Sequence, residues 1–295
     1  MLPLRAHWLL IAAPPVVASV AVLALGAVGT SIWLTHLVAI CLACVLAVGG
    51  SQLIGWARSI SPANAIILLT LAGVAVPLLR DSAGPKRWAL VGPFNLYMAP
   101  LWLPSFFAAC SVYLRKRGNH GLLACAATLG VSILLATQPD AAQVLALLGG
   151  SAVVFVRYHS DRLRSALMLL AVALVTAWAF LRPDPLEPVS YVEGVFALAL
   201  GHSLFAGLAV ITSAITLVTG LIVCSFGGPT WLAAVAAYYA VLFACSVAGL
   251  TPAPLIGYGA GPLLGFGLMV AVSRWIEAEV TLPNSLKPPP IRGTA

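Results

Sequence analysis

Charged side chains are scarce in this chain: Asp, Glu, Lys and Arg together supply only 8% of its 295 residues. A soluble domain carries about 25% charged residues, and no soluble fold could bury the 61% of apolar residues found here. Apolar runs of about 20 residues, the length that crosses the hydrocarbon core of a bilayer, recur along the whole sequence. The composition therefore excludes a soluble protein and predicts an all-α membrane protein with many spans.

Sequence motifs for redox or metal chemistry are also lacking. All six cysteines lie within apolar runs, and the Cys41-Leu-Ala-Cys44 pair falls mid-span with no second pair beside it. We interpret them as small, polarizable packing residues rather than as a redox or metal site. No cleavable signal is evident, because the apolar run after Arg5 and His7 is long enough to remain as the first span.

Ten apolar segments are predicted to cross the membrane, separated by turn residues such as Gly227-Gly228-Pro229. They are residues 8–28, 31–55, 62–79, 98–114, 120–137, 140–157, 164–181, 192–224, 230–250 and 259–277. The eighth is too long for a perpendicular span, so it either tilts or begins as a helix on the outer surface. Residues 1–280 are predicted to form a single transmembrane domain, and residues 281–295 a disordered cytoplasmic tail.

The distribution of basic residues predicts the orientation of the chain. With the N-terminus inside, eleven basic residues are cytoplasmic and four are outside. The inner set is Arg5, Arg58, Arg115, Lys116, Arg117, Arg157, Arg162, Arg164, Arg274, Lys287 and Arg292, and the outer set is Arg80, Lys86, Arg87 and Arg182. The positive-inside rule then places both termini in the cytoplasm and relates the net charge of +7 to membrane lipids rather than nucleic acid. The acids Asp81, Asp140, Asp184, Glu187 and Glu193 fall at the outer face, so carboxylate chemistry is expected there.

Two outer loops carry polar residues that need an explanation. Lys86, Arg87 and Trp88 are either an interfacial anchor or an electrostatic clamp for the phosphate of a lipid-linked substrate. Gln138-Pro-Asp140 joins spans five and six; Pro suits the first helical turn, and Asp140 is then placed to bind free amides at the helix start.

Glu193 is the strongest candidate for chemistry. An ionisable group at the membrane boundary is a functional candidate by default, and Arg182 is its nearest basic partner in sequence. The alternatives are catalysis or substrate contact, or a helix cap or structural ion pair. Glu193 and His202 are both predicted to lie in the eighth helix, where their nine-residue spacing directs them to opposite faces and excludes an acid–base pair.

A glycine-rich stretch opens the tenth span. Gly257, Gly261 and Gly265 are four residues apart, so they fall near one helix face and allow close backbone approach. Gly257 can equally belong to the preceding turn, and a re-entrant wall beside an outer cavity is the alternative to packing.

Four segments together resemble the SEDS family of cell-shape and cell-division membrane proteins, the FtsW and RodA type. Lys86-Arg-Trp-Ala-Leu-Val-Gly-Pro-Phe-Asn95 is similar to the family's R-W-hydrophobic-x-L-G-P segment, and Gln138-Pro-Asp140 to its Q-P-D. Pro252-Ala-Pro-Leu-Ile-Gly-Tyr258-Gly259 is similar to its P-L-P-F-hydrophobic-S-Y-G-G, and Glu193-Gly-Val-Phe-Ala197 falls where the family has D-F-I-F-A. The matches occur in the family's order and cover about residues 60–277.

The resemblance implies a multi-pass protein of the bacterial cytoplasmic (inner) membrane that polymerises the glycolipid lipid II with a class B transpeptidase as partner. Glu193 would be the catalytic carboxylate, and Lys86, Arg87, Trp88, Gln138, Asp140, Arg182 and Tyr258 would bind substrate. No metal-ligand cluster is visible, although a divalent cation would help the diphosphate leave. The family's Q-P-S-E-x-x-K is replaced by the segment from Tyr97 to Leu103, which lacks both the acid and the lysine.

Three hypotheses follow for the function. The first is peptidoglycan glycosyltransfer from lipid II at the outer membrane–water interface. The second is an interaction subunit of a division or elongation complex that keeps the fold without the activity, in line with the missing acid and lysine. The third, a transporter of lipid-linked precursors, ranks last because few intramembrane polar groups are available to line a cavity.

Overall fold

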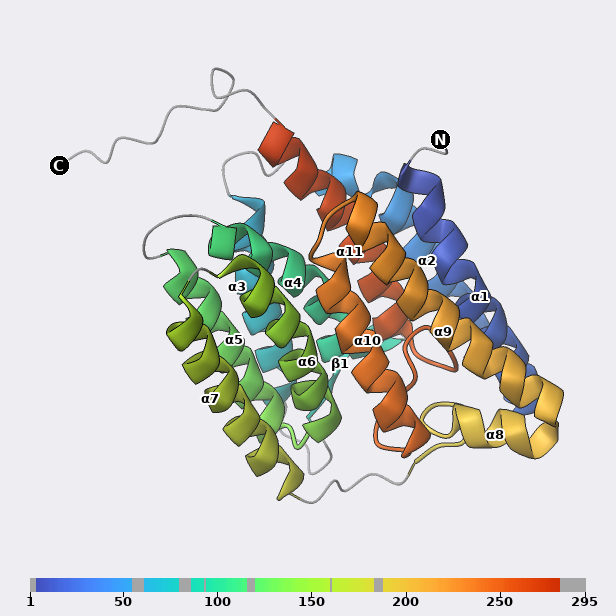
Figure 1. Cartoon of the computed structure of the whole chain (residues 1–295). Helices are drawn as coiled ribbons and strands as arrows, with labels where there is room; N and C mark the ends of the chain where they lie inside the picture. Colours follow the sequence, from blue (N-terminus) through green and yellow to red (C-terminus); the bar gives the residue numbers. More distant parts are fainter. Residues whose placement is uncertain are drawn as a thin grey trace.

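The computed structural model describes residues 4–54, 61–79, 86–92, 94–115, 120–159, 161–182 and 188–281. Helices dominate these ranges, and ten of them form a bundle (Figure 1). Their bounds are α1 (Leu4–Leu25), α2 (Thr30–Ile54), α3 (Pro62–Ala75), α4 (Met98–Arg115), α5 (His120–Thr137), α6 (Ala141–Tyr158), α7 (Arg162–Phe180), α9 (Leu204–Gly227), α10 (Leu232–Val247) and α11 (Ala260–Thr281). The predicted all-α membrane fold is confirmed; the predicted tail, apart from Thr281, lies outside the described residues.

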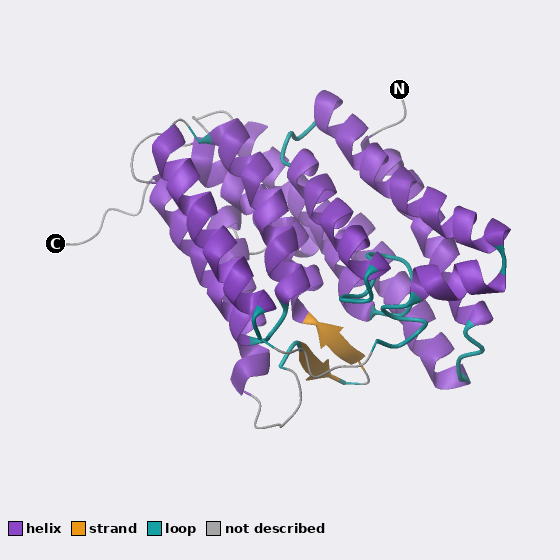
Figure 2. Ribbon diagram, turned by 60° about the horizontal axis from the view of Figure 1, so that its bottom comes forward, coloured by secondary structure: helices purple, strands orange, loops and turns teal. Residues whose placement is uncertain are grey.

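Two short elements lie away from the end of the bundle at which α1 begins and α11 ends (Figures 1 and 2). Helix α8 (Val195–His202) precedes α9, and a two-stranded antiparallel hairpin precedes α4. The hairpin consists of β1 (Trp88–Val91) and β2 (Phe94–Tyr97), with Trp88 opposite Tyr97. A 3₁₀ turn, η1 (Val76–Leu79), extends α3. The hairpin was missed from the sequence, since its four-residue strands are too short for an alternating pattern to stand out.

The eighth apolar run breaks into two helices at Ser203. This residue has extended backbone angles (φ −165°, ψ 153°), and its hydroxyl accepts a hydrogen bond from the Ala206 N–H at 3.1 Å. Ser203 therefore ends α8 and caps the start of α9. Of the two sequence expectations, a short helix before the span is the one that the structure contains, and Figure 1 shows α8 lying across the end of α9.

The sides of the bundle that would face lipid are apolar, as expected for a membrane protein. Along α7, for example, Leu163, Leu167, Leu170 and Leu174 are all exposed at helical spacing. Aromatic side chains such as Tyr238 and Phe106 are instead fully buried inside. By length and composition, five helices of the described chain could cross a bilayer (α2, α3 with η1, α6, α7 and α9), and α1, α5, α10 and α11 contain shorter apolar stretches.

Close packing of α11 depends on glycine. A side chain at Gly265 would overlap the carbonyl oxygen of Pro100 and come within 2.9 Å of the Leu101 Cα, so α11 can approach α4 only because the residue has none. The predicted close approach at this glycine face is confirmed for Gly265. Helix α11 also packs along α2, so the last span lies in the interior of the bundle.

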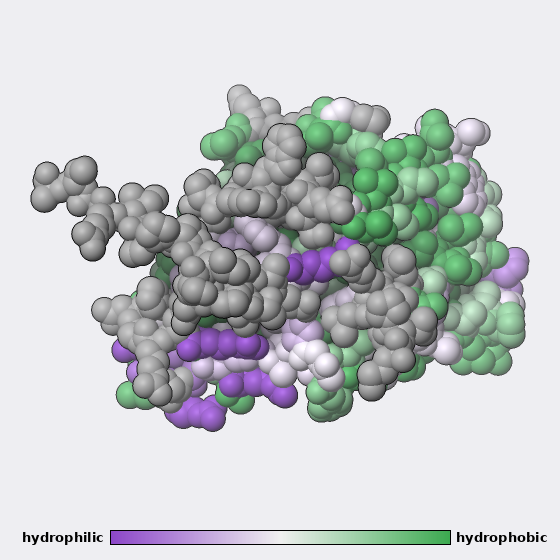
Figure 3. All heavy atoms as spheres, turned by 90° about the horizontal axis from the view of Figure 1, so that it is seen from above, coloured by the Kyte–Doolittle hydropathy of each residue, from purple (hydrophilic) through white to green (hydrophobic). Residues whose placement is uncertain are grey.

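Basic residues gather at the end of the bundle where α1 begins. Arg115, Arg157, Arg162 and Arg164 are exposed at this end, and Figure 3 shows hydrophilic atoms along one side of the face with apolar atoms on the other. Lys86, Arg87 and Arg182 lie at the opposite end, so the predicted segregation holds for these residues. The other members of the predicted sets that lie outside the described residues are Arg58, Arg80, Asp81, Lys116, Arg117, Asp184, Glu187, Lys287 and Arg292.

Candidate functional site at the outer face

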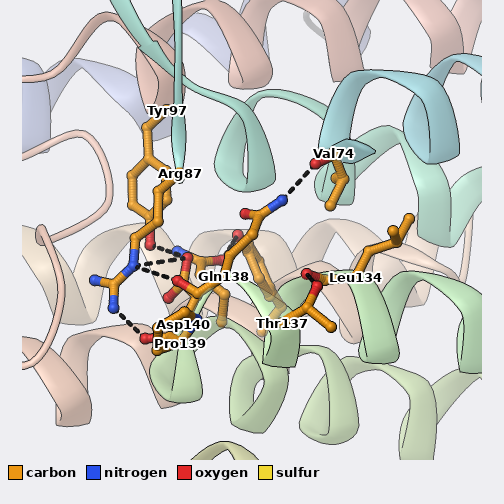
Figure 4. Close-up of polar contacts among 10 residues, drawn as sticks. Val74, Arg87, Tyr97, Leu134, Thr137, Gln138, Pro139 and Asp140 are labelled. Atoms are coloured by element: carbon orange, nitrogen blue, oxygen red, sulfur yellow. Dashed lines mark hydrogen bonds and ion pairs between the residues drawn. The ribbon is translucent and has the colours of Figure 1, made fainter. Parts of the chain in front are cut away.

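Arg87 anchors the hairpin to the loop between α5 and α6. The side chain is 5% exposed, and its Nε donates to the Gln138 carbonyl oxygen at 3.3 Å. Its Nη2 also donates to the Pro139 carbonyl oxygen, and its Nε lies 4.0 Å from the Asp140 carboxylate (Figure 4). A guanidinium has five N–H donors in a fixed planar array, which suits a site with several carbonyl and carboxylate oxygens. Arg87 thus joins two outer loops more than fifty residues apart in sequence.

The Asp140 carboxylate also accepts a hydrogen bond from Tyr97. The Tyr97 hydroxyl lies 2.6 Å from Asp140 Oδ2, and both side chains are buried. Burial raises the pKa of the Tyr97 hydroxyl well above its ordinary value; the Asp140 carboxylate raises it further, and Arg87 opposes this effect. Tyr97 therefore remains a neutral donor, and Arg87, Tyr97 and Asp140 form one buried polar cluster.

The sequence placed Asp140 correctly at a helix start but gave it the wrong contacts. Asp140 is the N-cap residue of α6, yet its side chain makes no capping hydrogen bond, because the carboxylate faces Arg87 and Tyr97 instead. Pro139 precedes the helix rather than occupying its first turn. The Gln138 side chain donates to the Val74 carbonyl oxygen at the end of α3 (Figure 4). The Q-P-D segment is therefore fastened to α3, the hairpin and α6 together.

Glu193 lies in a tight turn before α8, so the expectation that it belongs to the eighth helix was wrong. The carbonyl oxygen of Val189 accepts from the backbone N–H groups of Val192, Glu193 and Gly194 at 3.0, 2.9 and 3.1 Å. In return, Glu193 Oε2 accepts from the Val189 N–H at 2.9 Å. The side chain is half-buried, and the reciprocal bonds hold its carboxylate in one place at the outer end of the bundle.

The last turn of α10 and the loop between α10 and α11 fasten this turn from the side. The Tyr258 N–H donates to the Tyr191 carbonyl oxygen at 3.0 Å, and the Ser246 hydroxyl donates to the Glu193 carbonyl oxygen at 3.4 Å. Gly257 has φ +86°, and a side chain there would come within 2.8 Å of the Tyr191 oxygen. Gly257 therefore belongs to the preceding turn, one of the two possibilities left open by the sequence. Figure 2 shows the hairpin and these loops at the same end of the molecule.

The remaining predicted site residues take up different positions. Arg182 donates to the Ala136 carbonyl oxygen at 2.9 Å and lies over the Trp178 ring at 5.4 Å, so it packs against α5 and α7 rather than pairing with Glu193. Trp88 is half-buried against Tyr97, with ring centroids 5.5 Å apart, and Lys86 is half-exposed next to the buried Arg87. The structure thus brings together Arg87, Gln138 and Asp140, and separately Glu193 and Tyr258.

Sequence reasoning missed Tyr97, Tyr191 and Ser246 as members of these groups. Tyr97 follows a predicted loop, and its partner Asp140 is 43 residues away, so no local pattern connects them. Ser246 lies near the end of an apolar run, where a hydroxyl that bonds its own helix is the ordinary interpretation. A side chain at Gly261, the second residue of α11, would overlap the Tyr97 carbonyl oxygen, so the segment after α10 touches both groups.

Within the described ranges, no three His, Cys, Asp or Glu side chains are grouped to hold a metal ion.

Comparisons with known proteins identify the fold. The rod shape determining protein RodA of Thermus thermophilus superposes with a TM-score of 0.66 and 24% sequence identity, covering 90% of this chain and 95% of RodA. A mutant of the same protein with one aspartate changed to alanine gives 0.67 and 22%, covering 90% and 96%. A chain from the structure "Structural coordination of polymerization and crosslinking by a peptidoglycan synthase complex" gives 0.67 and 21%, covering 91% and 97%. No protein-family model and no curated protein matches the sequence. The chain therefore has the RodA fold, as the sequence resemblance implied.

Proposed function

We propose that this chain is a cell-wall assembly protein of the bacterial cytoplasmic membrane that transfers glycan units from lipid II at the outer face. The observation that carries the proposal is the fixed, half-buried carboxylate of Glu193 at the end of the bundle opposite the basic inner face. The fold supports it, because one similar chain comes from a peptidoglycan synthase complex. The orientation rests on the positive-inside rule.

In this proposal Glu193 acts as the general base. Its carboxylate would accept the proton of the acceptor sugar hydroxyl while that oxygen bonds to the anomeric carbon of the donor and the lipid diphosphate departs. A positioned base contributes about 10²- to 10⁴-fold to such a step. Lys86, the more exposed of the basic pair, would contact the diphosphate as a point charge. A divalent cation would be held chiefly by the diphosphate oxygens, because the described side chains supply no set of three ligands.

Arg87, Gln138 and Asp140 take a supporting role in this proposal. Arg87 bonds to the Gln138 carbonyl oxygen and pairs with Asp140, and the Gln138 side chain bonds to Val74. These buried side chains therefore shape the outer face rather than reach into solvent. Trp88 and Tyr258 would form aromatic surfaces beside the sugar or lipid, and Arg182 would fix the outer end of α7. A class B transpeptidase-like membrane protein is the proposed partner.

The alternative is an interaction subunit without catalytic activity. The engagement of Arg87 favours it, because a guanidinium bonded to Gln138 and Pro139 and facing Asp140 is already used within the chain. The replacement of the family's Glu and Lys between Tyr97 and Leu103 points the same way. In this case the fold would serve to dock and position the transpeptidase-like partner.

One experiment separates the two functions. The protein, purified with and without a cognate transpeptidase, is assayed for polymerisation of lipid II, together with Glu193→Gln and Lys86→Ala. Asp161→Asn is the matched control, since Asp161 is an exposed carboxylate that caps α7 at the inner end. We expect Glu193→Gln to lose at least about 100-fold in rate and the control to keep its rate. A rate for Glu193→Gln equal to that of the wild type would remove this residue from the mechanism. If no preparation makes polymer, the interaction subunit is the function that stands.

A further inference from the structure

We infer that His36, in α2, is a positioning residue for the Glu193 turn, acting through Tyr258. The inference deepens the proposed function, because it concerns the same carboxylate. His36 is 1% exposed and lies two turns into α2 from its outer end, so it belongs to the membrane-spanning part of the bundle. Polar groups inside a span are costly unless they are bonded, and their partners indicate what they hold in place.

The hydrogen bond of His36 connects α2 to α1. Its Nε2 lies 2.9 Å from the hydroxyl oxygen of Ser19, which is fully buried. The Ser19 hydroxyl donates its single proton to the Val16 carbonyl oxygen at 2.7 Å. Because that proton is already used, Ser19 can only accept from His36, so the neutral imidazole carries its hydrogen on Nε2. This fixes the imidazole against α1 in one orientation.

The ring of His36 in turn faces Tyr258. The two ring centroids are 6.3 Å apart, and the Tyr258 ring lies 6.5 Å from the Tyr191 ring in an edge-on arrangement. Burial raises the pKa of the Tyr258 hydroxyl above its ordinary value. The Tyr258 ring therefore packs against His36 of α2 on one side and against Tyr191 on the other.

Tyr191 belongs to the same turn as Glu193. The Tyr258 N–H bonds the Tyr191 carbonyl oxygen, and Gly26 at the end of α1 lies against the Tyr191 side chain, where an added Cβ would be 3.2 Å from the Tyr191 Cβ. A continuous series of contacts thus runs from Ser19 through His36, Tyr258 and Tyr191 to the Glu193 turn. Within this series, only Tyr191 and Glu193 are close in sequence. Its two ends, Ser19 and Glu193, are about 170 residues apart.

Three substitutions of His36 separate the contribution of its ring from that of its Nε2 hydrogen bond. His36→Phe keeps an aromatic ring beside Tyr258 and removes the Nε2 donor, and Ser19 keeps its bond to Val16, so no donor is left unpaired. His36→Gln can place an amide N–H near the position of Nε2, whereas the shorter His36→Asn cannot. Ser132→Ala is the matched control, because it removes another fully buried helix hydroxyl, in α5, away from the series.

Hydrogen exchange tests the inference without any activity. In His36→Phe and His36→Asn we expect the amides of residues 189–194 and 256–260 to exchange about tenfold faster than in the wild type, with the hairpin amides unchanged. His36→Gln should restore most of the protection, and Ser132→Ala should not alter it. Unchanged exchange in His36→Phe, or equal rescue by Gln and Asn, would overturn the inference.

Polymerisation kinetics distinguish positioning from loss of fold. With lipid II as substrate, His36→Phe should lower kcat about tenfold and leave KM within about twofold, because the Glu193 carboxylate is displaced while Lys86 and Trp88, which lie outside this series of contacts, stay in place. A raised KM with unchanged kcat would contradict positioning of the base. If the wild type makes no polymer, the proposed glycosyltransfer fails, and the exchange measurement still decides the role of His36 in the turn.

Discussion

Tyr97→Phe provides the most direct test of the buried cluster at the outer face. The substitution removes one hydroxyl and leaves the ring in place against Trp88. In the structure that hydroxyl donates to the Asp140 carboxylate at 2.6 Å, in a site where both side chains are buried. A hydrogen bond to a charged group contributes about 1.5–3 kcal/mol to stability. We therefore expect Tyr97→Phe to lower the free energy of unfolding by about 2 kcal/mol.

A loss of this size is measurable as a shift in Tm. For a chain of this length, 1 kcal/mol corresponds to slightly less than about 2 °C, so Tm should fall by about 3 °C. Tyr239→Phe is the matched control: Tyr239 is also fully buried in α10, but its hydroxyl has no hydrogen-bond partner among the described residues. Removing that hydroxyl should leave Tm unchanged or raise it. The assay is thermal unfolding of the detergent-purified protein, followed by tryptophan fluorescence.

A double-mutant cycle with Asp140→Asn assigns the effect to the pair. If the hydroxyl and the carboxylate act together, the double variant should be less destabilised than the sum of the single variants by about 1 kcal/mol. Equal Tm values for Tyr97→Phe and Tyr239→Phe, or strictly additive losses in the cycle, would refute the cluster as a source of stability.

Three other predictions concern pH, close packing and the break before α9. Because the pKa of Tyr97 is raised, the unfolded chain releases this proton near pH 10 while the folded chain keeps it. Its contribution to stability is therefore complete below about pH 10 and is lost above it, so Tyr97→Phe should lose less stability than the wild type between pH 9 and 11 in thermal unfolding. Gly265→Leu should destabilise the bundle by at least about 1–3 kcal/mol or prevent folding, while Gly227→Ala, which meets open space, should be tolerated; detergent size-exclusion profiles compare them. Ser203→Ala should cost about 1 kcal/mol in thermal unfolding by removing the cap on α9, and an unchanged Tm would exclude that role.

Much of the fold could be predicted because the membrane imposes a local rule. A span needs about 20 apolar residues, and the backbone polar groups within it must be satisfied internally, so helix positions can be read directly from the sequence. Nine of the ten predicted segments correspond to single helices, and the eighth corresponds to α8 and α9. The break at Ser203 was less accessible, since serine is common within spans and only the backbone angles show that it ends a helix.

The candidate site was only partly predictable. The resemblance of short motifs to the SEDS family singled out Arg87, Asp140, Glu193 and Tyr258 as site residues, and the solved structures confirm the fold that this resemblance implied. The contacts that these residues make were not predicted correctly. Glu193 was paired with Arg182 because the two are neighbours in sequence, whereas the structure places Arg182 over Trp178 and closes the Glu193 turn on Val189.

The sequence by itself determined that this is a helical membrane protein, which segments are helices and which end carries the excess of basic residues. These properties depend on composition and period, which are local. Tertiary structure alone decided that Arg87 meets Asp140, that Tyr97 completes their cluster, and that His36 reaches the Glu193 turn through Tyr258. Each of these contacts joins residues far apart in the chain, so it exists only once the helices have packed and brought their ends together.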